Sequence, residues 1–307
     1  MSGRGRDRGK GDYTRVGDVS EPAFVRLPDP ERVFAARAAR LAALAAGNPL
    51  GPYLAFLSRL VEVQHAACAA LPPAPPVPEP VLAQRLQHAM PPLSREALGE
   101  GGGFPATLDW LSRHAALPEA PEPAEQARAR LLAMAWPERL ELAAAVFDAA
   151  YPAEQLGESL YMAAALQVHL TRCAAQLDGS RLKPVGNGVC PACGSAPVAS
   201  MVVGWASANR ARYCCCSLCG TLWNYTRIKC TSCGSTGGIA YYAIEEEPGD
   251  VAAETCDTCG TYAKHLHQDK NTQLEPFADD LASFGLDVLV REKGFRRSAP
   301  NPLMIIG

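Results

Sequence analysis

Apolar residues recur three and four positions apart through most of residues 21–180, which is the spacing of one buried helix face. The first predicted helix begins at Asp29, because this residue can cap a helix whose first position is Pro30, and it stops at residues 47–48. Connectors rich in proline, alanine and glutamate separate the helices that follow. These are predicted at about residues 50–70, 79–90, 105–116, 124–135, 138–150 and 153–177. The pattern indicates a helical bundle.

The pattern changes after a linker at residues 183–188, where alanine gives way to β-branched residues, glycine and cysteine. Short strands are predicted at 197–204 and 237–244. The expected fold class is therefore α+β, an N-terminal all-α helical domain followed by two tandem metal-binding units like those of rubredoxin or zinc ribbons. The expected divisions are a disordered tail at 1–20, the helical domain at 21–183, the first unit at 184–225, the second unit at 226–270, and a C-terminal segment packed on the core at 271–307.

Composition narrows the class of protein. With 48% hydrophobic and 20% charged residues among 307, the chain can bury a sizeable core, so disorder throughout is not expected. The formal net charge of −3 gives the whole molecule no strong attraction to nucleic acid or to an anionic membrane. No run of about 18 apolar residues occurs, and residues 1–20 are polar. We therefore expect a cytoplasmic protein without membrane insertion and without nucleic acid as a partner.

Twelve cysteines carry the strongest signal in the sequence. In a long chain of a reducing compartment, clustered cysteines are more typical of metal sites than of disulfides. Ten lie within residues 190–259; Cys68 and Cys173 lie outside and are expected to be buried small hydrophobic residues. The string CPACGS at 190–195 returns forty residues later as CTSCGS, and CSLCGT at 216–221 returns as CDTCGT. This repeat indicates a tandem duplication.

Each Cys-x-x-Cys pair places two sulfurs on one tight turn, and the glycine after it permits the positive φ that such a turn needs. Two turns supply four thiolates, which suit a tetrahedral site for zinc or iron. A unit this small has little core, so metal binding, worth about 10–16 kcal/mol for structural zinc in small domains, would supply most of its folding free energy. The predicted ligands are Cys190, Cys193, Cys216 and Cys219 in the first unit, and Cys230, Cys233, Cys256 and Cys259 in the second.

Two alternatives to these metal sites remain open at this point. The pairs could be redox dithiols of the thioredoxin kind, although that motif normally occurs once, in a βαβ context. The cysteine pairs could also interleave across the two units, although the duplication favours each unit closing its own site. Cys214 and Cys215 have no counterparts, because Glu254 and Thr255 stand at those positions. They are either ordinary strand residues or thiols that exchange with Cys216 or respond to oxidation.

The other polar candidates are expected to be structural. His265 and His267 are predicted to be surface residues, and Asp279–Asp280 is expected to begin a helix. The remaining histidines lie in separate helical segments and form no catalytic constellation, so we do not expect an enzyme. Basic and aromatic residues near the cysteines could form a nucleic-acid face, but we expect solvated charges and core aromatics. This group comprises Arg210, Arg212, Arg227, Lys229, Lys264, Trp205, Trp223, Tyr225, Tyr241 and Tyr242.

From residue 190 onward the sequence resembles the formate dehydrogenase accessory protein family, FdhE. The resemblance rests on CPACGSAPVAS, RYCCCSLCGTLWNYTRIKCTSCGS, ETCDTCGTYAKHLHQDK, EPFADDLASFGLDVLV and GFRRSAPNP, which follow in this order to the C-terminus. The N-terminal half is similar mainly in length, in helicity and in the segment DPERVFAARAARLAALA. The consecutive Cys214 and Cys215 depart from the family motif, which needs only the position of Cys216.

The resemblance implies a cytoplasmic accessory protein that is required for active respiratory formate dehydrogenase and does not itself oxidise formate. It implies iron of rubredoxin type at the eight cysteines, where spacing alone leaves zinc as an alternative. It also implies contact with the catalytic subunit of formate dehydrogenase before export, with an action on that subunit's redox state or cofactor loading. A rubredoxin-like electron carrier and a zinc-ribbon nucleic-acid-binding module are the alternative functions, and a homodimer is left open.

Overall fold

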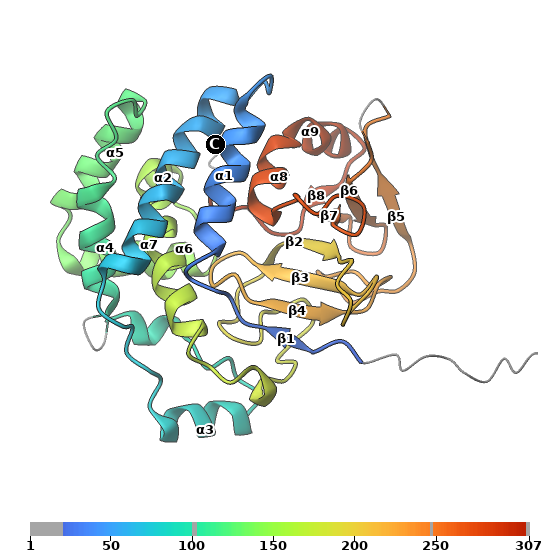
Figure 1. Cartoon of the computed structure of the whole chain (residues 1–307), viewed down its shortest axis with the longest axis horizontal. Helices are drawn as coiled ribbons and strands as arrows, with labels where there is room; N and C mark the ends of the chain where they lie inside the picture. The colour runs from blue at the N-terminus through green and yellow to red at the C-terminus, as the bar shows by residue number, and fades with distance from the viewer. Residues whose placement is uncertain (1–20, 100–102, 246–247, 305–307) are drawn as a thin grey trace, which may run out of the picture.

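The computed structural model describes residues 21–99, 103–245 and 248–304, and the predicted tail at residues 1–20 lies outside this described part. Helices fill the N-terminal half, and the C-terminal half forms a sheet with two short helices, so the expected α+β class is confirmed (Figure 1). The N-terminal helices are α1 (Val33–Ala45), α2 (Gly51–Ala70), α3 (Glu79–Gln87), α4 (Gly103–His114), α5 (Glu122–Ala133), α6 (Trp136–Phe147) and α7 (Leu156–Ala174), with short 3₁₀ helices η1 (Arg95–Gly99), η2 (Ala153–Gln155) and η3 (Gly179–Arg181).

Two details of the N-terminal prediction are wrong. Helix α1 begins at Val33 and not at Asp29, because residues 30–32 form a turn in which the Asp29 carbonyl accepts hydrogen bonds from the N–H groups of Arg32 and Val33. Residues 21–183 are also not all helical, since Val25–Arg26 forms strand β1 and pairs antiparallel with a strand from the C-terminal half. The first residues of the helical region are thereby attached to the sheet.

Helix α7 lies at the centre of the helical region and packs against α2, α4, α5 and α6. Residues 158–174 are all buried. The sequence explains this, because small and apolar residues on every side of a helix favour burial all round. Some of its polar side chains are paired within the core, as where the amide Nε2 of Gln64 donates to Oε1 of Gln167 over 3.0 Å. This helix therefore forms a rigid support for the elements that pack on its C-terminal half.

The sheet has eight strands in the order β1-β4-β3-β2-β7-β6-β5, with β8 paired to β7. Each cysteine-rich unit contributes an antiparallel set of three strands, and the parallel pair β2–β7 joins the two sets into one sheet, with Ala199 opposite Lys264 and Val202 opposite His267. The two units therefore share one continuous sheet and are not structurally separate domains. The strands are β2 (Pro197–Val202), β3 (Arg212–Cys216), β4 (Leu222–Tyr225), β5 (Ile239–Tyr242), β6 (Val251–Cys256), β7 (Thr261–His267) and β8 (Arg296–Arg297), and the helices among them are α8 (Pro276–Ala282) and α9 (Phe284–Glu292).

The two units differ in the core that they share with the rest of the protein. The largest hydrophobic cluster runs from α1 through α7 into the first unit, and includes buried Val198, Leu218 and Trp223. Among the helices, the second unit packs mainly on α9, where a small separate cluster contains Tyr262, Leu286 and Val290 among its four buried members; only Leu266 of its buried strand residues joins the largest cluster through apolar packing. Because burial of apolar area is the main source of stability, the first unit is anchored on the helices and the second is held more lightly.

Buried charges tie the C-terminal segment to the sheet. The ammonium Nζ of Lys264 lies 2.7 Å from Oδ2 of Asp287, and Arg297 contacts Oδ1 of Asp280 at 2.6 Å and Oδ1 of Asp287 at 2.9 Å. Lys264 and Asp280 are fully buried, so the expectation of a solvated Lys264 is wrong. Asp279 lies in the first turn of α8, near the helix N-terminus as predicted, whereas the cap itself is Glu275, which accepts from the N–H groups of Phe277 and Ala278.

Candidate metal centres

Four tight turns carry the predicted ligands. In the turns that begin at Cys190, Cys230 and Cys256, the carbonyl of the first cysteine accepts a hydrogen bond of 2.8 to 3.0 Å from the N–H of the glycine after the second cysteine. In all four turns, the glycine after the second cysteine has a positive φ. This region of backbone conformation favours glycine, because a Cβ there meets the backbone. The values are 83° at Gly194, 71° at Gly220, 78° at Gly234 and 66° at Gly260. The glycine requirement read from the repeat is confirmed.

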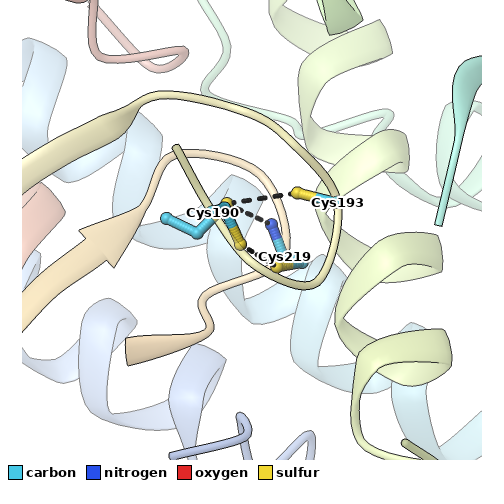
Figure 2. Close-up of side chains that lie close together, drawn as sticks. Cys190, Cys193 and Cys219 are labelled. Atoms are coloured by element: carbon cyan, nitrogen blue, oxygen red, sulfur yellow. Dashed lines mark hydrogen bonds between the residues drawn. The ribbon is translucent and has the colours of Figure 1, made fainter. Parts of the chain in front are cut away.

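The first tetrad is formed by the turns that precede β2 and follow β3. The Sγ atoms of Cys190 and Cys219 are 3.6 Å apart, and those of Cys193 and Cys216 are 3.3 Å apart. All four sulfurs lie within 4.8 Å of one another, and all four residues are buried. Figure 2 shows the side chains of Cys190, Cys193 and Cys219 gathered around a common point. The structure thus brings together the four cysteines that the sequence predicted as ligands in the first unit.

The second tetrad repeats this arrangement in the turns before β5 and between β6 and β7. The sulfurs of Cys230 and Cys259 are 3.7 Å apart, and so are those of Cys233 and Cys256. All four again lie within 4.8 Å of one another, but Cys233 is exposed and Cys259 is half-buried. Each tetrad closes within its own unit, so the interleaved pairing of the two units is wrong.

The donor set and spacing fit a tetrahedral metal ion. Four sulfurs at about 2.3 Å from a central ion lie about 3.8 Å from one another, and the closest pairs here are 3.3 to 3.7 Å apart. Zinc and iron both accept a tetrathiolate set of this shape. Either tetrad could therefore hold one ion, and when bound that ion would supply either structural cross-linking or, as iron, a one-electron redox centre.

Hydrogen-bond donors surround the sulfurs. The N–H groups of Leu218 and Cys219 each point to Sγ of Cys216 at 3.4 Å, and those of Ser232 and Cys233 point to Sγ of Cys230 at 3.3 and 3.5 Å. Such donors stabilise the thiolate form that a metal requires. In three of the four turns the residue two positions after the second cysteine places a hydroxyl near its sulfur: Ser195 Oγ is 3.4 Å from Cys193, Thr221 Oγ1 3.1 Å from Cys219 and Thr261 Oγ1 3.0 Å from Cys259. In the fourth turn the Ser235 hydroxyl donates instead to the Gly237 carbonyl at 3.0 Å.

The pKa values of three thiols in the first tetrad are shifted in different directions. Burial raises the pKa of Cys190 and Cys216 well above the ordinary thiol value, whereas hydrogen bonds from the neighbouring thiols lower the pKa of Cys193 well below it. The Cys193 sulfur thus carries negative charge more readily than those of Cys190 and Cys216. Binding of a cation at the centre would displace the remaining protons, so occupancy should fall as pH falls.

The helical region covers the first tetrad through contacts that the sequence analysis missed. On α7, Thr171 donates from Oγ1 to the Cys219 carbonyl at 3.2 Å, and Gln167 donates from Nε2 to the Ser217 carbonyl at 3.0 Å. The N–H of Leu93 donates to the Ala192 carbonyl at 2.9 Å. Residues 167 and 171 are four apart, so they share one face of α7, and this was the available signal.

Cys214 and Cys215 lie on β3 and are both buried. Burial raises the pKa of the Cys214 thiol to about 12 and also raises that of Cys215. A neutral thiol is a poor nucleophile and a poor metal ligand, so these two behave as strand residues in the core. Cys173 is buried as expected, whereas Cys68 is only half-buried.

The prediction that His265 lies on the surface is wrong, and His267 is only partly exposed. His265 is 4% exposed, and its Nδ1 lies 2.9 Å from Oγ of Ser200 on the neighbouring strand. Burial lowers the pKa of His265 well below its usual value, with the positive charge of Arg212 acting in the same direction. Neither histidine belongs to either tetrad. His265 is therefore buried by strand pairing in the sheet and not by a role as a metal ligand.

Comparison with known proteins identifies the family. Models of three FdhE regions match the chain: the N-terminal model over residues 22–187, the central-domain model over residues 189–227, and the C-terminal-domain model over residues 228–304. The chain belongs to the FdhE family of formate dehydrogenase accessory proteins. The first tetrad lies within the FdhE central-domain match and the second within the C-terminal-domain match.

Individual FdhE relatives agree with this assignment. The FdhE homolog of Rhizobium meliloti (strain 1021) is 43% identical over 234 residues, which are 74% of this chain and 76% of that protein. The FdhE homolog of Edwardsiella ictaluri (strain 93-146) is 35% identical over 235 residues, 74% of each chain. The crystal structure of the FdhE protein from Pseudomonas aeruginosa superimposes with a TM-score of 0.82 at 31% identity, over 92% of this chain and 99% of that chain. The fold described above is thus an FdhE fold.

Proposed function

We propose that this protein assists the assembly of respiratory formate dehydrogenase in the cytoplasm, where it binds the catalytic subunit before export and acts on that subunit's redox state or cofactor loading. Membership in the FdhE family carries the proposal. The two cysteine tetrads support it, since the fold brings together two sets of four thiols that could each hold a metal ion. Among the described residues, no helix is both long and apolar enough to cross a membrane.

We further propose that the protein does not itself oxidise formate. Within the part of the chain that the structure describes, Cys173 and His169 on α7 lie together outside the tetrads and the sheet, with Sγ and Nε2 3.7 Å apart. Burial raises the pKa of Cys173 to about 11 and lowers that of His169 to about 4. A neutral thiol beside a neutral imidazole lacks the thiolate that nucleophilic catalysis needs, so this pair supports a structural role.

We propose rubredoxin-type iron as the metal of the tetrads in the cell, with zinc as the alternative. Native protein purified without air should show visible thiolate-to-iron charge-transfer absorption, and zinc protein should be colourless. A reversible potential at these sites, together with normal formate oxidation in cells that lack the protein, would favour the electron-carrier alternative. Binding to DNA or RNA with a steep dependence on salt would favour the nucleic-acid alternative.

The assembly proposal is tested by partner capture and by gene deletion. Native protein should co-purify with the catalytic subunit of formate dehydrogenase under anaerobic conditions, and cells that lack the protein should contain that subunit without formate oxidation. Protein loaded with redox-inert zinc, supplied to deficient extracts, separates the two modes of action: full rescue assigns the metals a structural role, and failure beside an active iron form assigns a redox role. Undiminished formate oxidation in the deletion strain would refute the assembly function.

A further inference from the structure

The two tetrads share their local geometry and differ in their access to solvent. In the first, Cys190, Cys216 and Cys219 have no exposed surface and Cys193 is 2% exposed. In the second, Cys230 and Cys256 are buried, but Cys233 is exposed and Cys259 is half-buried. Cys193 and Cys233 occupy the same position in the forty-residue repeat. The same turn is therefore closed in one unit and open in the other.

Packing around the first tetrad explains its closure. The turn that contains Cys193 is held by the hydrogen bond from Leu93 to the carbonyl of Ala192, and Pro91 lies against Gly194, 3.2 Å from where a Cβ would stand. The turn at Cys219 is held by Thr171 of α7. A pocket lined in part by Cys193, Gly194 and Ser195 borders this tetrad, but the four cysteines have almost no exposed surface. A reagent therefore reaches these sulfurs mainly when the contact between the helices and the first unit opens, and such local opening is rare where apolar packing is dense.

The contacts of the second tetrad leave one side uncovered. The side-chain amide of Asn187 donates to the carbonyls of residues 230, 231 and 232 at 3.3 to 3.4 Å, and the Tyr225 hydroxyl donates to the carbonyl of Cys230 at 3.0 Å. These contacts fix the buried Cys230 side of the turn. On the other side, the hydroxyls of Ser235 and Thr258 form an exposed hydrogen bond of 3.1 Å. Cys233 thus faces solvent while its partner Cys230 is held.

We propose that the second tetrad is an exchangeable metal site at which an incoming thiolate displaces Cys233, and that the first tetrad is a retained structural site. The sulfur of the incoming thiolate bonds to the ion as the bond to Cys233 Sγ breaks, and the released Cys233 thiolate takes a proton from water. No electron is transferred, and four sulfur ligands are kept. Cys230 and Cys256 hold the ion during the exchange, since both are buried. The proposal concerns movement of the ion and does not depend on the identity of the client.

Zinc release from the full-length protein tests the proposal. Zinc-loaded protein is mixed with excess 4-(2-pyridylazo)resorcinol, with and without glutathione, and the coloured zinc complex is followed. We expect two zinc ions per chain, one released roughly tenfold or more faster than the other, because the buried tetrad must first open locally. Glutathione should accelerate only the fast phase. Release of both ions at one rate, or a fast phase that glutathione leaves unchanged, would overturn the proposal.

Matched variants assign the phases. Cys233→Ser should abolish the fast phase and leave one slowly released zinc, whereas Cys193→Ser, the equivalent change in the first unit, should remove the slow phase. Persistence of the fast phase in Cys233→Ser contradicts the assignment. If Cys193→Ser does not fold, alkylation of the native zinc protein decides: iodoacetamide should modify Cys233 before Cys193, as located by mass spectrometry, and the reverse order would reject the proposal. A protein that binds no zinc would reject the metal centres themselves.

Discussion

Replacement of Arg212 by methionine tests whether a buried ion pair holds the two units in one sheet. Arg212 on β3 of the first unit donates from Nη2 to Oε1 of Glu254 on β6 of the second unit at 2.8 Å, and the two side chains are 0% and 3% exposed. Its Nη1 also donates to three backbone carbonyls of the segment 226–229 that connects the units, at 3.1 to 3.3 Å. One side chain therefore bridges both units and their connection.

The expected loss of stability is large because both partners are desolvated. Arg212→Met would leave the Glu254 carboxylate buried with the Tyr241 hydroxyl, 2.8 Å away, as its remaining hydrogen-bond donor. Loss of one partner of a buried ion pair typically costs about 3–5 kcal/mol. The double variant Arg212→Met/Glu254→Leu removes both charges and should recover part of this, leaving about 1–3 kcal/mol because the three carbonyls still lack their donor.

Urea unfolding at constant excess zinc, followed by far-UV circular dichroism and tryptophan fluorescence, measures these differences. Arg181→Met is the matched control, because Arg181 forms an exposed pair with Glu79 and its loss should leave the midpoint unchanged. The reasoning would be refuted if Arg212→Met behaved like this control. It would also be refuted if the double variant were no more stable than the single one.

Three other changes test separate parts of the structure. Gly188→Ala should reduce the zinc bound at the second tetrad, because φ is +59° and a Cβ would lie 1.9 Å from a backbone oxygen of that unit. Metal analysis measures this loss. The control is Gly249→Ala, where φ is +70° and nothing lies within 4 Å of the new Cβ, so it should cost only about 1 kcal/mol of backbone strain and keep its zinc. Burial lowers the pKa of His169 to about 4, so stability should be complete above the unfolded value of about 6.5 and fall by of order 3 kcal/mol as pH drops toward 4. His169→Gln should flatten that part of the profile of unfolding free energy against pH, and an unchanged slope would contradict the assignment. Cys230→Ser with Cys233→Ser should unfold the second unit while far-UV helicity largely survives, since that unit has a small separate cluster; loss of all cooperative structure would show that the units are inseparable.

Local features of the sequence were sufficient to predict the helices and the tetrads. Helix limits from α2 to α7 follow apolar spacing and proline-rich connectors, and they agree with the structure to within about three residues. The forty-residue repeat predicted which four cysteines meet in each unit, because a Cys-x-x-Cys-Gly turn is determined by residues adjacent in the chain. The two turns of each unit are joined by a pair of antiparallel strands, β2–β3 in the first unit and β5–β6 in the second, so their meeting requires little information from elsewhere.

Tertiary structure alone decided how the units are joined and which tetrad is open. Glu254, which stands at the repeat position of Cys214, became the partner of Arg212, and Lys264 and His265 became buried where strands β2 and β7 pair. Only the first unit lies beneath α7, so equivalent cysteines differ in exposure. The physical reason is range: turn geometry depends on neighbours in sequence, whereas burial, ion pairing and access of solvent to sulfur depend on residues brought from distant parts of the chain.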